Sequence, residues 1–242
     1  FLSGSCQQAN DDPFSNIGTL FSIIASQENP AFFLHQGDWG YPDTTDDNGG
    51  PYFAEDFANV QASYRAKYIN TYPMNDLFRI APIDYVYDDH DMVNNNSDRT
   101  FPGIANSIKG YNDYFPHYPL ASESNGLWHK FSYGNAEIFV IDNRSQRDPN
   151  LSAFTILENN YVEFTPPSGH TILGDEQMNW LLTELTSSTA KWKFISTGTS
   201  FNPANRLAME LAVLLQSVIP GVDTPQGYVT PTQVAVNTAD AW

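Results

Sequence analysis

The sequence has little cysteine, little positive charge and no long apolar run. Its single cysteine, Cys6, cannot form a disulfide within the chain, so the cysteine count gives little information about the redox compartment. No apolar run approaches the roughly 20 residues that a membrane-spanning helix needs, so we expect no membrane span. The first ten residues contain no basic group, and no signal peptide is visible there.

Positive charge is scarce because 11 Lys and Arg residues face 28 Asp and Glu residues, which gives a formal net charge of −17. Such a surface repels nucleic acid and anionic headgroups over about a Debye length, so we expect no nucleic-acid partner. The excess of acid has two interpretations. It keeps a protein in solution, or, where the acids are clustered, it holds cations.

The chain is long enough for one packed domain, and 41% of its residues are hydrophobic. Strand-like and helix-like segments alternate along it, which predicts an α/β fold with a layered sheet core. We expect strands over 31–36, 78–87 and 191–197, a hairpin over 127–142 that turns near Gly134-Asn135, and helices over 53–72, 174–185 and 205–218. The polar, Gly-rich stretch 43–51 is predicted to be an exposed loop.

Polar clusters follow three of the predicted strands directly. They are Gln36-Gly37-Asp38, Tyr87-Asp88-Asp89-His90 and Asp142-Asn143-Arg144. In open α/β sheets, ligands bind just beyond the carboxyl ends of the strands. The three clusters are therefore predicted to converge on one site.

Each cluster has a chemical and a plain structural interpretation. Asp38 is either a ligand or a turn aspartate. The run 88–91 places three carboxylates and an imidazole together, which repel unless a cation or strong donors compensate, and the alternative is a solvated turn. Arg144 offers a planar fork that fits a phosphate, or it is a surface arginine paired with Asp142 or Asp148.

Taken in order, these motifs resemble the PhoD-like alkaline phosphatases, a branch of the calcineurin-like metallophosphoesterases. The resemblance rests on these segments, quoted in chain order: Ser3-Gly4-Ser5-Cys6-Gln7, Gly37-Asp38-Trp39-Gly40-Tyr41, Ser63-Tyr64-Arg65, Tyr87-Asp88-Asp89-His90-Asp91 with Asn94-Asn95, Ile141-Asp142-Asn143-Arg144, Leu173-Gly174-Asp175-Glu176-Gln177 and Trp180-Leu181. The resemblance extends over nearly the whole chain. It implies a metallophosphoesterase sandwich of mixed β-sheets flanked by helices.

The resemblance also implies a ferric iron (Fe3+) with calcium ions (Ca2+) nearby. The metal ligands that it suggests are Cys6, Asp38, Tyr41, Asp88 and Asp89, with Asp38 in the bridging position and Asp89 where the wider superfamily has a metal-binding asparagine. The same resemblance gives two catalytic residues: His90 would contact the substrate or protonate the leaving group, and Arg144 would bind the phosphate. A thiolate and a phenolate together favour a strongly Lewis-acidic ion such as ferric iron.

The family pattern is not matched everywhere. Asp91 stands where many members have Glu, and the end of the chain, 239–242, resembles a segment upstream of a later strand that carries further ligands. The resemblance therefore implies one metallophosphoesterase domain over 1–242 with its C-terminal part missing.

The predicted function is the hydrolysis of a small phosphate monoester or diester in the periplasm or outside the cell. One alternative is a non-catalytic metal-binding protein or inactive fragment of the same fold. A third interpretation is a plain α/β domain whose acidic side chains only keep it hydrated.

Overall fold

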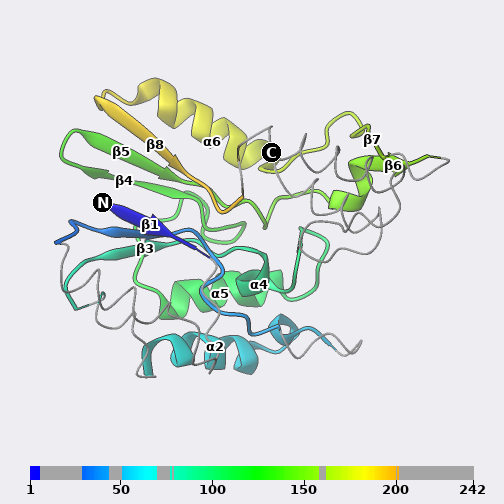
Figure 1. Ribbon diagram of the computed structural model, residues 1–242, viewed down its shortest axis with the longest axis horizontal. Helices are drawn as coiled ribbons and strands as arrows, with labels where there is room; N and C mark the ends of the chain where they lie inside the picture. The colour runs from blue at the N-terminus through cyan, green and yellow to red at the C-terminus, as the bar shows by residue number, and fades with distance from the viewer. Residues whose placement is uncertain are drawn as a thin grey trace, which may run out of the picture.

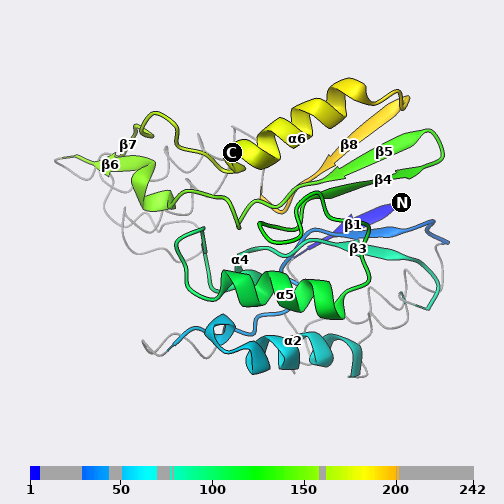
Figure 2. The same cartoon turned by 180° about the vertical axis from the view of Figure 1, so that it is seen from behind.

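The computed structural model describes residues 1–5, 29–43, 51–69, 77, 79–157, 162–199 and 201. These residues form two stacked three-stranded β-sheets with helices on both outer sides, as both views show, and a separate two-stranded sheet (Figure 1, Figure 2). The predicted α/β class, with sheets flanked by helices, is confirmed. Within the described residues, no helix is both long enough and apolar enough to cross a membrane.

The first sheet has the parallel strands β1 (Leu2–Gly4), β2 (Phe33–His35) and β3 (Ile83–Tyr85), in that spatial order. Gly4 pairs with His35 and His35 pairs with Tyr85, so the three strands end at the same level. All three residues of β2 are buried, as expected for a central parallel strand covered on both faces. This register brings the loops after β2 and β3 to one edge.

The second sheet contains β4 (His129–Tyr133), β5 (Ala136–Val140) and β8 (Trp192–Ser196). β4 and β5 form the predicted hairpin, and β8 runs parallel to β5. Alternate residues of β5 point to opposite faces. Ile138 joins the core between the sheets, whereas Phe139 packs with Leu181 of the helix α6 (Gly174–Ser187). Both faces of this strand are therefore apolar.

On the other side of the molecule, α5 (Ile104–Tyr114) packs against α2 (Phe57–Ile69) beneath the first sheet (Figure 1). Tyr111 of α5 donates a hydrogen bond to the carbonyl of Tyr85, 2.7 Å away, and so ties this layer to β3. The remaining elements are short: η1 (Phe53–Glu55), α4 (Asp89–Met92), η2 (Asn150–Ser152), β6 (Phe154–Ile156) and β7 (Val162–Phe164).

Most of the predicted elements are present, with shifted bounds. The strands expected over 31–36 and 191–197, the hairpin and the helix over 174–185 are confirmed. The segment 53–72 begins with η1 before α2, and the strand expected over 78–87 is confined to Ile83–Tyr85 because residues 79–81 turn and Pro82 precedes it. The helix expected over 205–218 lies outside the described residues.

The exposed loop predicted over 43–51 is contradicted at Asp43, whereas Pro51 is exposed and residues 44–50 lie outside the described residues. Asp43 is only 4% exposed, although it was expected to begin an exposed loop. Its carboxylate is buried because it pairs with His90, which belongs to the short helix α4 that follows β3.

Candidate metal centre

The loops after β2 and β3 are in direct backbone contact. Gly37 has φ +93°, and a Cβ placed there would lie 2.4 Å from the Asp88 Cβ and 2.5 Å from the Asp88 backbone nitrogen. Only glycine permits both this conformation and this approach. Gly37 therefore lets Asp38, which follows it, lie beside the Asp88-Asp89-His90 turn.

Asp38, Asp89 and His90 each offer a ligand atom, and these atoms all lie within 4.8 Å of one another. Asp38 itself has φ +55°, a left-handed conformation that is strained for a residue with a side chain and that is found preferentially at functional sites. Tyr41 donates a hydrogen bond to Asp38 Oδ2 at 3.1 Å, and its ring centroid is 4.3 Å from that of His90. Two carboxylates, an imidazole and a phenol therefore lie close together. These oxygen and nitrogen atoms form a ligand set that suits a metal ion.

The electrostatic environment around Asp38, Asp89 and His90 favours the presence of positive charge there. Burial and the neighbouring carboxylates of Asp89, Asp91 and Asp88 raise the pKa of Asp38 to about 8, although His90 opposes them. Burial lowers the pKa of His90, but the hydrogen bond to Asp43 and the charges of nearby carboxylates outweigh it and raise this pKa to about 9. Carboxylates gathered in this way are stabilised by a cation.

His90 is oriented by Asp43, a residue that the sequence did not indicate. The His90 Nδ1 atom lies 2.6 Å from Asp43 Oδ2. Because a carboxylate accepts, Nδ1 carries the proton, and Nε2 is the nitrogen that can bind a ligand or transfer a proton. No sequence signal distinguishes Asp43 from the other acids of the polar stretch, since its partner is 47 positions away.

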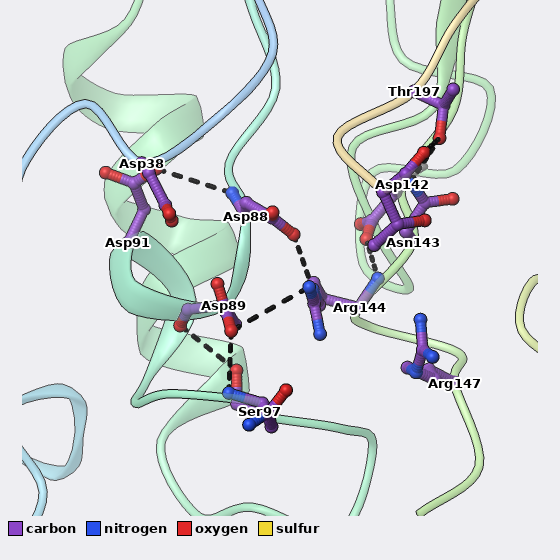
Figure 3. A network of polar contacts seen from close by, with 12 residues as sticks. Asp38, Asp88, Asp89, Asp91, Ser97, Asp142, Asn143, Arg144, Arg147 and Thr197 are labelled. Atoms are coloured by element: carbon purple, nitrogen blue, oxygen red, sulfur yellow. Dashed lines mark hydrogen bonds and ion pairs between the residues drawn. The ribbon is translucent and has the colours of Figure 1, made fainter. Parts of the chain in front are cut away.

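Arg144 reaches this group from the loop after β5. Its side chain is 1% exposed, its Nε donates to Asp88 Oδ1 at 2.5 Å, and its Nη2 is 3.8 Å from Asp89 Oδ2 (Figure 3). Asp142 shapes the loop, since its Oδ1 accepts the backbone N–H groups of Arg144 (2.9 Å) and Ser145 (3.0 Å). The interpretation of Arg144 as a surface arginine is therefore wrong, and the predicted convergence of the three strand-end clusters is observed.

The predicted metal ligands are placed unequally. Asp38 and Asp89 belong to the close group, Tyr41 borders it, and Cys6 lies outside the described residues. The Asp88 carboxylate faces Arg144 and does not belong to the 4.8 Å group. Asp89 is held by the backbone N–H of Asn96, which donates to its Oδ2 at 2.6 Å.

Comparison with known proteins agrees with this architecture. Alkaline phosphatase D of Bacillus subtilis (strain 168) is 31% identical over 163 residues, which are 59% of this chain and 26% of that protein. A solved structure of PhoD has the same fold, with a TM-score of 0.58 and 24% identity, and the match covers 82% of this chain and 41% of that one. The chain thus spans less than half the length of either relative. The model of the PhoD-like phosphatase family matches residues 1–241, and we conclude that the chain belongs to this family.

Proposed function

We propose that this chain carries the metal centre of a phosphoester hydrolase that acts on small phosphate monoesters or diesters. The observation that carries this proposal is the meeting of Asp38, Asp89 and His90 within 4.8 Å at the ends of two parallel strands. Membership of the PhoD-like phosphatase family supports hydrolysis of a phosphoester as the reaction.

The donor set suits the two ions that we propose, ferric iron and calcium. Asp38, Asp89 and Tyr41 are the proposed ligands in the described part of the chain, and Cys6 is a further proposed iron ligand. Asp88 is predicted as a ligand as well, although its contact with Arg144 supports a role in holding that side chain. When bound, the ions would acidify a water molecule and neutralise charge on the phosphate.

The chain's own groups would position and protonate the substrate. Asp43 holds the His90 ring, so that Nε2 can deliver a proton to the leaving oxygen. Arg144 lies between Asp88 and Asp89, and its guanidinium would bind phosphate oxygens by exchanging these contacts. In a chain of net charge −17, an anionic substrate depends on such local positive charge.

The test is hydrolysis of an aryl phosphate and of an aryl phosphodiester by metal-loaded protein. We expect the Asp38→Ala and His90→Ala variants to lose activity by about 100-fold or more, since general acid catalysis alone supplies about 10²- to 10⁴-fold. His117→Ala, which alters a half-buried histidine outside this group, is the matched control and should keep the wild-type rate. Stoichiometric metal binding without hydrolysis of either ester would instead support the non-catalytic alternative.

The identity of the iron has its own readout. Ferric iron bound by the Tyr41 phenolate should give a visible charge-transfer band that disappears in Tyr41→Phe. A colourless protein without iron by metal analysis would refute the iron assignment. The proposed location of the enzyme is the periplasm or the extracellular space.

A further inference from the structure

Asp91 links the two loops that carry the proposed metal ligands. Its Oδ2 accepts the backbone N–H of Trp39 at 3.1 Å and the backbone N–H of Asp88 at 3.3 Å. Trp39 follows Asp38 directly, and Asp88 precedes Asp89. Figure 3 shows the Asp91 carboxylate next to Asp38 and joined to Asp88. One oxygen atom therefore sets the spacing between the two loops.

The other oxygen of Asp91 is paired with Lys67 of α2. The Lys67 Nζ lies 3.2 Å from Asp91 Oδ1, and the two side chains are 7% and 1% exposed. Three aromatic rings surround the ammonium group: the ring centroids of Tyr64, Tyr85 and Trp39 lie 4.7, 5.0 and 5.6 Å from Nζ. Cation–π contacts and one carboxylate thus compensate the burial of this charge.

A buried ion pair is weak evidence for a contribution to stability. Burying a Lys and an Asp loses hydration that the ion pair regains only in part, and a pair of apolar residues of similar volume is often at least as stable. What a carboxylate adds is a charged acceptor, which binds two N–H groups more strongly than a neutral oxygen does. The relevant effect of the Lys67–Asp91 pair is therefore the spacing that it sets between the two ligand-bearing loops.

We propose that Lys67 and Asp91 form a positioning pair, which sets the separation of Asp38 and Asp89 and thereby the affinity of the centre for its cations. This inference rests on the proposed metal centre. Neither residue touches the substrate. Lys67 acts on Asp91, and Asp91 acts on the backbone of both ligand loops. The pair also assigns a role to Asp91, whose side chain points away from solvent although it follows His90 directly.

The test uses a variant that keeps the shape of the side chain. In Asp91→Asn, the single amide oxygen can accept from Lys67 or from the loop N–H groups, but not from both. The amide NH2 then faces the remaining donors, with which it cannot form a hydrogen bond. We expect the affinity for calcium or ferric iron, measured by calorimetry, to fall roughly 10- to 100-fold, as is typical when a group that orients metal ligands is removed. Lys67→Met keeps both loop bonds of Asp91 and should lower the affinity by less. This second variant also serves if Asp91→Asn does not fold.

Asp84→Asn is the matched control for a purely structural effect. Asp84 is likewise a buried aspartate paired with a cationic side chain, since both of its oxygens lie 3.0 Å from His129 Nε2. We expect this variant to lower the melting temperature while leaving metal affinity within about twofold of wild type. Equal losses of affinity in Asp84→Asn and Asp91→Asn would overturn the proposal, and so would wild-type affinity in both Asp91→Asn and Lys67→Met.

Hydrolysis is measured on the same preparations to separate this inference from the proposed function. If the wild-type protein binds metal but hydrolyses neither ester, and Asp91→Asn binds metal more weakly, the proposed enzymatic function is refuted and the positioning pair is supported. A wild-type protein that binds no metal would refute both.

Discussion

Arg144 allows the strongest prediction about the stability of the site. Its buried guanidinium makes a charge-assisted hydrogen bond of 2.5 Å to Asp88, which it also neutralises. In Arg144→Met, the side chain keeps much of its apolar volume but the charge is lost. The buried Asp88 carboxylate then remains without its cation, so we expect a large loss of stability.

The expected size follows from this burial. Removing one partner of a buried ion pair costs about 3–5 kcal/mol. For a chain of this length, each kcal/mol lowers the melting temperature by about 2–4 °C, so the total shift should be roughly 6–20 °C. In the double variant Asp88→Asn/Arg144→Met, the unpaired charge is absent, and the cost should fall below the sum of the single costs by about 1–3 kcal/mol.

The assay is urea unfolding, in the presence of a chelator, of the wild-type protein, the single variants Arg144→Met and Asp88→Asn, and the double variant. Lys109→Met is the matched control, because Lys109 forms an exposed ion pair with Asp113, and exposed pairs contribute about 0–1 kcal/mol. If the costs of Arg144→Met and Asp88→Asn add within about 0.5 kcal/mol, the two side chains are not coupled and the reasoning is refuted.

Two further predictions concern the loop contact and the pH dependence of stability. Gly37→Ala should cost about 2–4 kcal/mol in urea unfolding, because the new Cβ would meet Asp88 at 2.4 Å, whereas Gly134→Ala, with φ +60° and nothing within 4 Å, should cost only about 1–2 kcal/mol; equal costs would contradict the close approach. Burial lowers the pKa of His129, but the charge of Asp84 and its hydrogen bond raise it above 6.5 overall. The folded state therefore holds this proton more tightly than the unfolded state, so the stabilisation is complete below about pH 6.5 and is lost as pH rises through the folded pKa. Relative to His129→Gln, the wild-type protein should lose up to about 1.4 kcal/mol per pH unit in that window, and a constant difference between pH 6 and 9 would show that the pair does not titrate.

The sequence predicted the site well where local patterns carry the information. The apolar run into Gln36-Gly37-Asp38 and the hairpin over 127–142 are local signals, and parallel strands end at a common edge. The convergence of Asp38, Asp89 and Arg144 follows from these facts.

The sequence could not predict the partners that come from distant segments. The local sequence predicts an exposed loop at Asp43, whereas its burial depends on His90, 47 positions further along. The helix predicted over 53–72 gives no role to Lys67, since its role depends on Asp91, 24 positions away on another element. Such pairs arise from tertiary packing, and one sequence contains no pattern that reveals them.

The central claim is that Asp38 and Asp89 share a cation, with His90 beside it. The most direct measurement is an anomalous difference map from a crystal of the protein loaded with iron or calcium. The account predicts a peak within about 2.0–2.6 Å of carboxylate oxygens from both Asp38 and Asp89. A peak elsewhere, or none at this position in fully loaded protein, would contradict it.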